Sequence, residues 1–521
     1  MNITSPFVNH SYANRPSVLI VGAGIGGLSA AVRLVAAGAR VTVLEQHGYP
    51  GGKIRTMDST AGPVDAGPTV LTMRSVFDDI FAAAGTRLDD HVTLIQQDIL
   101  ARHFWPDGSR LDLFADPDQS IAAVADFAGP TAVAEFRAFC ARCKTLFDAF
   151  EGPMMQTAVP RLIDLTRCVL SQPTLIRQMT PLFTLAQALN AHFSDPRLAQ
   201  LFGRYATYVG GSPYASPALL ALIWQAEAAG VWAVQGGMHR LAHVLADVAQ
   251  ARGARFYYRT KVDQILVKDG QAIGLALTDG TRQMADAVLF NGDPRALATG
   301  TLGQSLRRVA TRSRSLPRSH SARVYSFAAA VSGPELAHHN VFFADNPRRE
   351  FDALTAGLVP QTPTLYICAE DRGQGIDWPR TERFEIIANV PALSGRVASQ
   401  EKDIRSWHEM IIRTMTHHGL HFDPTPNTNS LTTEMTFARL FPGSLGALYG
   451  QSPHDLTSAF KRPTARTPIR NLYLTGGGTH PGAGMPMVAI SARHAVEAIL
   501  NDLTLTSRSV PMAMLGGMLT A

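Results

Sequence analysis

The sequence contains few cysteines and lacks long uncharged apolar runs. Four cysteines in 521 residues are too few for a disulfide framework and fit a reducing compartment. Stretches of about 20 residues are interrupted by charges, glycine or proline, which excludes an integral protein with several spans. Residues 1–16 lack a charged segment followed by an apolar one, so they do not resemble a secretory signal. These absences predict a cytoplasmic protein.

Charge is also scarce. Charged residues make up 17% and hydrophobic residues 46% of the chain, which excludes a disordered protein and allows large cores. The length predicts two to four folded units. The net charge is +5, but the basic residues are scattered and form no stripe, so we expect no nucleic-acid partner. A basic surface does suit anionic lipid headgroups.

A strand, a glycine-rich turn and a helix follow one another near the N-terminus. The β-branched run Ser17–Val21 predicts a buried parallel strand. The turn that follows has GxGxxG spacing, with its glycines at Gly22, Gly24 and Gly27. A predicted helix then ends at Gly38, and a second predicted strand, Arg40–Leu44, ends at Glu45. This order of elements is typical of a dinucleotide-binding unit.

Each of these residues would have a distinct role in binding a dinucleotide. Gly22 permits the tight turn, Gly24 lets the backbone approach a pyrophosphate, and Gly27 allows helix and strand to pack closely. The helix N-terminus offers free N–H groups and the positive end of a dipole. Glu45 stands where a carboxylate accepts hydrogen bonds from an adenosine ribose. We therefore predict dinucleotide binding rather than a purely structural glycine turn.

A second glycine pair, Gly51 and Gly52, follows the acid and precedes Lys53. This pattern resembles the extended signature of the FAD-dependent amine oxidase and phytoene desaturase superfamily. The resemblance implies that the backbone at Gly52 lies against FAD and that Lys53 lies near the pyrophosphate and ribitol. The family often has arginine there, so the charge is kept but the bidentate fork is lost. The alternative for Lys53 is a solvated surface side chain.

A glycine-rich loop near the C-terminus completes the resemblance. The run that begins at Thr475, Thr-Gly-Gly-Gly-Thr-His-Pro-Gly-Ala-Gly, lies between a predicted strand and a predicted helix. By resemblance this unit closes the FAD domain, and Gly477, Gly478 and Met487 bind the cofactor. Its helix N-terminus would point at the pyrimidine side of the flavin. The same resemblance places the backbone of Val262 against the adenine.

The C-terminal loop and two internal blocks of sequence narrow the resemblance to one branch of the family. The C-terminal loop is similar to that of bacterial carotenoid desaturases, and the blocks Arg204–Tyr214 and Gly230–Met238 resemble the 1-hydroxycarotenoid 3,4-desaturase branch (methoxyneurosporene dehydrogenase type). This implies C-3,4 desaturation of a 1-hydroxycarotenoid such as 1-hydroxyneurosporene. A phytoene desaturase or carotenoid isomerase of the same family is one alternative. A non-redox prenyl-binding protein of the GDP-dissociation-inhibitor type is another, which the intact Glu45 and glycine loops disfavour.

The expected fold class is α/β, with a Rossmann-like FAD-binding domain of the amine oxidase/phytoene desaturase type interleaved with a sheet-plus-helix substrate domain. Within the substrate domain, residues 118–200 predict a helical cap. Residues 255–277 predict an antiparallel meander. The predicted FAD-binding parts are 16–110, 230–300 and 466–502. The predicted substrate-domain parts are 111–229 and 301–465, and 503–521 form a C-terminal tail.

Partners follow from the implied chemistry. A second GxGxxG after another strand is missing, so no NADPH site is evident, and we expect electrons to leave to oxygen or a quinone. The substrate would be an acyclic carotenoid as long as a bilayer core, about 30 Å. We therefore expect peripheral attachment to the inner face of a membrane, helped by the apolar run 510–519. The segment Arg307–Arg318 predicts an exposed loop that is a weaker candidate for membrane contact.

Two ionisable residues are candidates for catalysis. His480 is the ionisable side chain of the C-terminal loop and could polarise the flavin or move a proton, or could simply hold the loop. Glu227 lies in an apolar stretch, where burial would suit a proton acceptor, although an exposed helix position is equally open. Aromatic residues of the middle region could line a polyene tunnel or pack in the core: Tyr205, Tyr208, Trp224 and Trp232. The CxxC pair Cys140 and Cys143 lacks a second pair, and no metal site is predicted.

Overall fold

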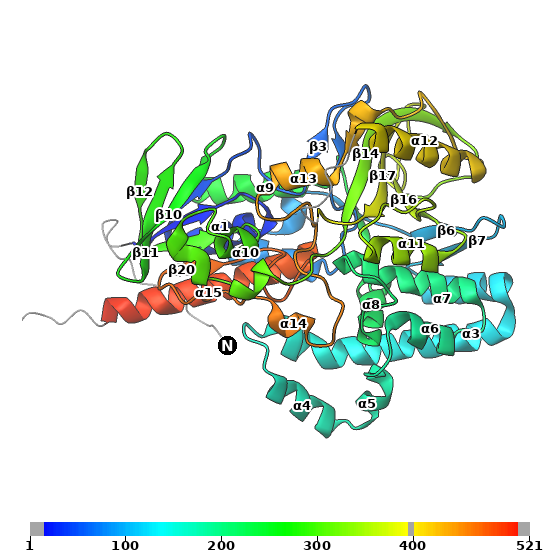
Figure 1. The fold of residues 1–521 in the computed structure, drawn as a ribbon, viewed down its shortest axis with the longest axis horizontal. Coiled ribbons are helices and arrows are strands. Elements are labelled where there is room, and N and C mark those ends of the chain that lie inside the picture. The colour runs from blue at the N-terminus through cyan, green and yellow to red at the C-terminus, as the bar shows by residue number, and fades with distance from the viewer. Residues whose placement is uncertain (1–14, 394–400, 509–521) are drawn as a thin grey trace, which may run out of the picture.

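A parallel sheet forms the centre of one half of the molecule, on the left of Figure 1. The computed structural model describes residues 15–393 and 401–508. The sheet has five strands in the order β20-β13-β1-β2-β9. Their bounds are β1 Ser17–Val21, β2 Arg40–Leu44, β9 Arg255–Tyr257, β13 Ala287–Phe290 and β20 Leu472–Leu474. Strands from three distant parts of the chain therefore meet in one sheet, as the interleaved fold class predicts.

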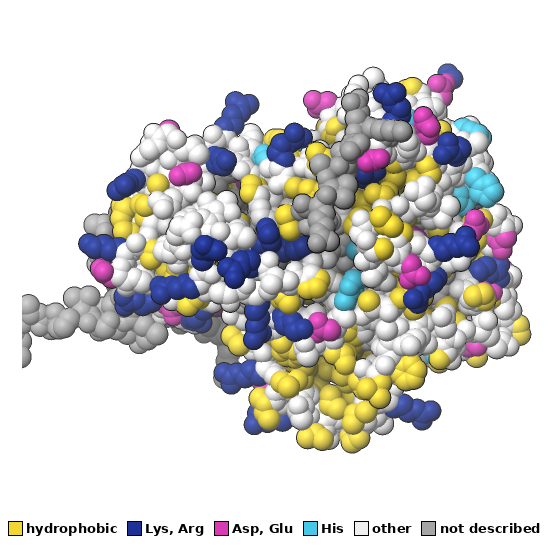
Figure 2. All heavy atoms as spheres, viewed as in Figure 1, with side chains coloured by type: hydrophobic (Ala, Val, Ile, Leu, Met, Phe, Trp, Pro, Cys, Tyr) yellow, Lys and Arg dark blue, Asp and Glu magenta, His cyan; other side chains and the backbone are white. Residues whose placement is uncertain are grey.

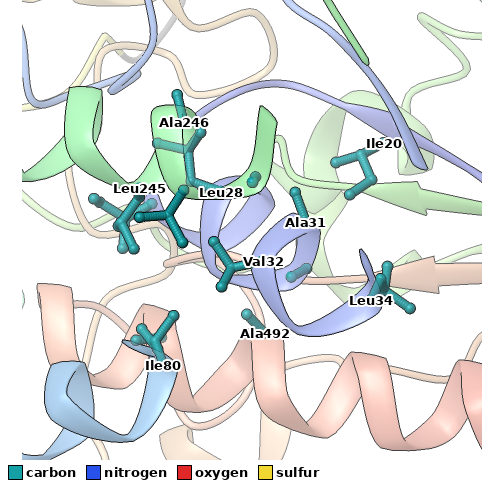
Figure 3. Packing of buried hydrophobic residues seen from close by; sticks show 14 of the residues in the cluster. Ile20, Leu28, Ala31, Val32, Leu34, Ile80, Leu245, Ala246 and Ala492 are labelled. Atoms are coloured by element: carbon teal, nitrogen blue, oxygen red, sulfur yellow. The ribbon is translucent and has the colours of Figure 1, made fainter. Parts of the chain in front are cut away.

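Helices α1 (Ile25–Ala36), α2 (Ser75–Ala83), α9 (His239–Ala251) and α15 (Met485–Arg508) pack together against this sheet. Figure 3 shows Leu28 and Val32 of α1 between Leu245 on α9 and Ala492 on α15. Small residues at the contact allow close approach, and large ones fill the remaining space. The packing fixes the N-terminus of α1 at the carboxyl edge of the sheet.

The predicted meander is only partly correct. Strands β10 (Val262–Lys268), β11 (Gln271–Leu277) and β12 (Arg282–Met284) do form an antiparallel sheet. The segment Arg255–Tyr257 does not belong to it, because β9 pairs in parallel with β2. A short run of alternating residues fits either partner, and the free edge of the parallel sheet decides the pairing.

A larger sheet of eight strands forms the second half, at the upper right of Figure 1. Its strands are β6 Ile99–Phe104, β7 Arg110–Phe114, β14 Ser321–Ser332, β15 His339–Phe342, β16 Leu365–Ala369, β17 Glu382–Val390, β18 His421–Asp423 and β19 Leu431–Thr432. Helix α12 (Glu401–His417) covers one face through Trp407 and Ile411. The expected domain boundary at residue 110 falls inside the β6–β7 hairpin, and both strands of that hairpin belong to this sheet.

Helices lie below the large sheet in Figure 1. They are α3 Pro117–Phe150, α4 Leu162–Ser171, α5 Thr174–Met179, α6 Leu185–His192, α7 Pro196–Gly203 and α8 Ile223–Ala228, with the short helical segments η3 Glu151–Gln156, η4 Arg204–Val209 and η5 Ala218–Leu222. Helix α3 is kinked at Gly129, where φ is 80° and Pro130 follows. This is the predicted helical cap. Within the described residues, no helix is both long and apolar enough to cross a bilayer.

Shorter elements connect the halves. The two-stranded sheets are β3 (Thr56–Met57) with β4 (Val64–Asp65), and β5 (Leu94–Gln96) with β8 (Trp232–Val234). The remaining helices are η2 Leu88–Asp90, α10 Pro294–Ala298, η6 Gln304–Arg308, η7 Thr311–Arg314, α11 Pro347–Thr355, η8 Thr428–Ser430, α13 Glu434–Leu440 and α14 Ser458–Lys461. The Arg-rich segment 307–318 thus contains helical turns, and four of its arginines are exposed: Arg307, Arg308, Arg312 and Arg314.

Candidate cofactor and substrate site

One cavity of about 990 Å³ runs from the carboxyl edge of the parallel sheet into the helical cap. Its sheet end is lined by both glycine-rich turns, Glu45 and the C-terminal loop. We call this end the cradle. Its other end is lined by apolar side chains of the cap, among them Phe147, Phe150, Leu222 and Ile223. We call this end the apolar half.

The first glycine turn has the geometry that its spacing predicts. Gly22 has φ of +98°, a conformation that favours glycine. Gly24 is the N-cap residue of α1. A Cβ on Gly27 would lie 2.1 Å from the Gly22 carbonyl oxygen, so only glycine allows this contact between helix and turn. Gly22 and Gly24 line the cavity, whereas Gly27 acts through packing.

Asn291 holds the turn in place and was missed by the sequence analysis. It follows β13, and its Nδ2 donates to the carbonyl oxygens of Gly22 (3.1 Å) and Gly24 (3.2 Å). A Cβ on Gly26 or on Gly476 would come within 3 Å of its Oδ1. Asn291 thus joins the N-terminal turn to the C-terminal loop. The available signal was a polar residue directly after a buried parallel strand.

Glu45 lies at the end of β2 and is only 4% exposed. Its Oε2 accepts from the Ala23 N–H at 2.7 Å, and its Oε1 accepts from the His47 N–H at 2.8 Å. The carboxylate lines the cavity beside Val262, the first residue of β10. The Thr260 N–H donates to the Glu45 carbonyl oxygen, which keeps the two segments adjacent. This arrangement is suited to a ribose hydroxyl with an adenine next to it.

The second glycine pair lies directly on the first turn. The Gly51 N–H donates to the Ala23 carbonyl oxygen at 2.8 Å. A Cβ on Gly52 would lie 3.0 Å from the Gly24 Cα. Because neither backbone carries a side chain here, an extended ligand in the cavity can approach the backbone of both turns. The sequence spacing alone did not reveal this direct contact.

Lys53 lines the cavity rather than the open surface. Its Nζ donates to the Leu448 carbonyl oxygen. Burial lowers the pKa of Lys53 to about 8, while Asp293 acts to raise it and Arg318 to lower it further. Asp293 forms an ion pair with Arg318. A cation in this position is suited to an anionic group of a dinucleotide.

The C-terminal loop lies opposite the first turn. Gly477, Gly478 and Met487 all line the cavity, and Met487 is in the first turn of α15. A Cβ on Gly478 would lie 2.4 Å from Pro294 Cδ. Arg462 Nη1 donates to the Gly477 carbonyl oxygen at 2.7 Å, and burial lowers the pKa of Arg462 to about 10. This arginine is a second cation of the cradle that spacing could not identify.

His480 belongs to the same loop but is not among the residues that line the cavity. Its Nε2 lies 2.8 Å from the Thr157 carbonyl oxygen, and its ring stacks on His494. Burial lowers the pKa of His480 to about 4, so the ring is neutral near pH 7. This geometry favours the role of holding the loop, which the sequence analysis left open.

Glu227 does line the cavity and is 2% exposed. Its Oε1 accepts from the Tyr205 hydroxyl at 2.8 Å and its Oε2 from the Tyr208 hydroxyl at 2.6 Å. Arg204 donates to Tyr208 Oη at 3.1 Å. Burial alone would lower the pKa of Arg204, but Tyr208 and Glu227 outweigh it and raise that pKa. Glu227 is therefore part of a buried charged network.

Only some of the candidate aromatic residues reach the cavity. Tyr208 lines it, whereas Tyr205 and Trp224 pack with Phe202 in the core of the cap. Trp232 packs against the core of the other half. On α3, Cys140 accepts from Trp224 Nε1, and burial raises its pKa to about 11, so the thiol of this CxxC is unreactive.

Comparisons with known proteins identify the family. The chain matches the flavin containing amine oxidoreductase family over residues 25–372. It is 52% identical over 495 residues to a hydroxyneurosporene desaturase of Cereibacter sphaeroides, covering 95% of this chain and 99% of that protein. A hydroxyneurosporene desaturase of Rhodobacter capsulatus is 48% identical, with 93% and 98% covered. An oxidoreductase structure from Methanosarcina mazei aligns with a TM-score of 0.58 at 15% identity, covering 92% of this chain and all of that one.

The chain therefore belongs to the flavin containing amine oxidoreductase family and, within it, to the carotenoid desaturases. It is an FAD-dependent oxidoreductase, as the sequence analysis predicts. The cradle fits FAD: it combines side-chain-free backbone, a carboxylate suited to a ribose and two cations suited to phosphates. Gly24, Glu45, Lys53 and the C-terminal loop would hold the cofactor.

Proposed function

We propose that the protein introduces a double bond at C3–C4 of a 1-hydroxycarotenoid such as 1-hydroxyneurosporene. The observation that carries the proposal is the continuity of the cavity, which is lined by Glu45 at one end and by apolar side chains of the cap at the other. A polyene can therefore extend from the cap to the cofactor within one cavity. The names of the relatives, hydroxyneurosporene desaturases, support this substrate.

The chemistry removes two hydrogens from neighbouring carbons, one with its electron pair and one as a proton. FAD, when bound, supplies the acceptor for the hydride. The chain contributes positioning and the exclusion of water. The apolar half, with residues such as Leu219 and Ile223, would hold the polyene in one orientation. Glu227 stays a predicted proton acceptor, although both of its oxygens already accept hydrogen bonds from tyrosines.

The direct test is conversion in vesicles. Protein loaded with FAD is mixed with lipid vesicles that contain 1-hydroxyneurosporene, and the products are separated by chromatography. We expect a product with one more conjugated double bond and a longer-wavelength absorption. Conversion of phytoene instead would favour the phytoene desaturase alternative. Binding of carotenoid without any conversion would favour the non-redox alternative.

The electron acceptor is proposed to be oxygen or a quinone. In the part of the chain that the structure describes, the GxGxxG turn after β1 is followed by no second turn of that sequence pattern. Anaerobic mixing with NADPH should therefore leave the flavin absorbance unchanged over the turnover time. Rapid stoichiometric bleaching would contradict this proposal.

We also propose that the protein works at the cytoplasmic face of a membrane, with α4 and α5 as the docking surface. Figure 2 shows hydrophobic side chains gathered at the bottom of the molecule, over these helices of Figure 1. The docking surface consists of exposed apolar residues of segment 159–183: Val159, Leu162, Ile163, Leu170, Ile176, Leu182 and Phe183. Leu162 is 68% and Leu170 69% exposed.

A bilayer explains why α4 is apolar on two sides. Its inner residues Leu165 and Val169 pack on a cluster with Phe147, which lines the cavity. Its outer residues face solvent. A helix that is apolar on both sides is normally buried, and a lipid surface supplies the missing cover. The segment also carries net positive charge, because it contains three arginines, Arg161, Arg167 and Arg177, and one acidic residue, Asp164. This charge is suited to anionic lipid. The apolar run 510–519 lies outside the described residues.

A further inference from the structure

A hydrogen-bonded chain of three side chains begins at the cavity wall. Thr69 Oγ1 lies 2.6 Å from Tyr366 Oη, which lies 2.7 Å from His339 Nδ1. Thr69 and Tyr366 line the cavity, and His339 is 1% exposed. Burial lowers the pKa of His339 far below its ordinary value, helped by His338 and Arg204. The imidazole is therefore neutral and carries one N–H.

Counting the protons of these three side chains shows that the Thr69 hydroxyl can make a further hydrogen bond in the cavity. Each of the three groups supplies one proton. If His339 Nδ1 accepts from Tyr366, then Thr69 donates to Tyr366 and keeps free lone pairs. If His339 Nδ1 donates, then Tyr366 can donate to Thr69, whose own proton is free. Tyr366 can instead donate to Cys368 and accept from Thr69, which keeps free lone pairs. Either tautomer leaves the Thr69 hydroxyl able to make one more hydrogen bond with a ligand.

The Glu227 carboxylate, another polar group of the cavity lining, is fully occupied by comparison. Both Glu227 oxygens accept a tyrosine hydroxyl. The Tyr208 hydroxyl donates to Glu227 and accepts from Arg204. The network balances a cation against an anion, and both carboxylate oxygens are occupied, although the buried Arg204 Nε has no partner among the described residues. Among the buried groups of the cavity lining, Thr69 and Glu350, whose Oε1 has no partner in the described part of the chain, can still bind a ligand hydroxyl, whereas the Glu227 carboxylate is already occupied.

The position of Thr69 matches the chemistry of the proposed substrate. A Cβ on Gly67 would lie 2.0 Å from the Lys53 carbonyl oxygen, so the segment Gly67–Thr69 lies against the cradle. In a 1-hydroxycarotenoid the oxygen is three covalent bonds from C3, which is about 4 Å at most. The group that binds this hydroxyl must therefore lie close to the cofactor end of the cavity, and Thr69 follows a segment that lies against the cradle.

Resting on the function proposed above, we propose that Thr69 and Tyr366 bind the tertiary hydroxyl of the substrate and thereby determine specificity. His339 is a positioning residue that orients the Tyr366 hydroxyl. A carotenoid without the hydroxyl would leave the buried end of this chain unpaired, which is the physical basis for rejecting it.

The test compares 1-hydroxyneurosporene with neurosporene, both presented in lipid vesicles to the FAD-loaded protein. Equilibrium binding is followed by the carotenoid absorption shift, and turnover by product analysis. Thr69→Val and Tyr366→Phe should each lower the preference for the hydroxylated carotenoid about tenfold, the worth of one hydrogen bond. Thr207→Val is the matched control, because this cavity threonine donates to the Arg204 carbonyl oxygen and is no part of the chain from Thr69 to His339. It should leave the preference unchanged.

The positioning role of His339 is tested by comparing a substitution that keeps a hydrogen-bonding group with one that removes it. His339→Gln keeps a group that can hydrogen-bond Tyr366 and should retain most of the preference, whereas His339→Leu should lose it with flavin content intact. Equal binding of the two carotenoids by the wild type, or an unchanged preference in both Thr69→Val and Tyr366→Phe, overturns the proposal. The binding measurement separates the two proposals: preferential binding without any conversion would contradict the proposed desaturation and leave hydroxyl recognition supported.

Discussion

The cradle and the apolar half of the cavity are built from different parts of the chain. The cradle uses backbone atoms from two short turns and a loop, together with a few side chains such as Glu45 and Lys53. The apolar half uses side chains from the helices of the cap and from the large sheet. The cradle is therefore held by the packing of α1 against its sheet, whereas the apolar half depends on how two separate layers meet.

This difference has consequences for substitution. In the cradle, the absence of a Cβ is the feature that matters, because even one methyl group at Gly27 or Gly52 meets backbone atoms. In the apolar half, single side chains can change in size while the cavity persists, but buried polar groups must stay paired. Substitutions in the cradle should thus affect cofactor binding, and substitutions in the apolar half should affect stability and specificity.

The largest effect is expected in the cradle. Gly24→Val should abolish FAD binding, because a Cβ there lies 3.2 Å from Asn291 Nδ2 and the branched side chain would occupy the path of the pyrophosphate. Flavin absorbance per mole of purified, folded protein is the measurement. Gly152→Val is the control, since a Cβ at Gly152 meets no atom within 4 Å. Full flavin content in Gly24→Val would refute the assignment.

The next effect concerns the charged network of the apolar half. Glu227→Gln should lower the free energy of unfolding by about 3 kcal/mol, because Arg204 would remain buried without its counter-charge. Combining it with Arg204→Met should recover part of that loss in a double-mutant cycle of denaturant unfolding. If Glu227→Gln keeps its stability and loses only turnover, the proton-acceptor role would be favoured instead.

A smaller effect separates the two roles left open for His480. Its pKa in the folded protein, about 4, is below the unfolded value. The unfolded chain therefore binds the proton first as pH falls, and stability is lost between about pH 6.5 and 4. His480→Gln should reduce this loss by roughly 2 kcal/mol between pH 7.5 and 4.5, measured by denaturant unfolding, and should retain turnover. Parallel pH profiles, or a large loss of turnover with full flavin content, would contradict the structural role.

The smallest effect is expected at the docking surface on α4 and α5. Leu162→Ser with Leu170→Ser should weaken co-sedimentation with anionic vesicles about tenfold, because less apolar surface enters the lipid. High salt should weaken it further. Leu358→Ser with Ile376→Ser is the control, as these residues are 62% and 69% exposed but lie outside the docking surface. Equal loss in both pairs would argue against a specific surface.

Much of the fold was predictable where a motif has local causes. Strand β1, the turn at Gly22 and helix α1 follow from a β-branched run, glycine spacing and small residues that are adjacent in sequence. Strand β9 was assigned to the wrong sheet, because three residues carry too little pattern to choose between an antiparallel neighbour and the free edge beside β2. The sequence also left open whether Trp224 and Trp232 line the tunnel or pack in the core, because an aromatic residue type does not specify which way its side chain points.

The sequence by itself determined the dinucleotide-binding turn, the ribose acid and the family, because these depend on residues close together in the chain whose spacing is fixed by backbone geometry. Only the tertiary structure decided that Asn291 joins both glycine loops and that His480 faces away from the cavity. It also decided that Thr69 meets Tyr366, a residue 297 positions away, and that Tyr366 in turn meets His339. Such contacts depend on the register of strands from different layers, which no local pattern specifies.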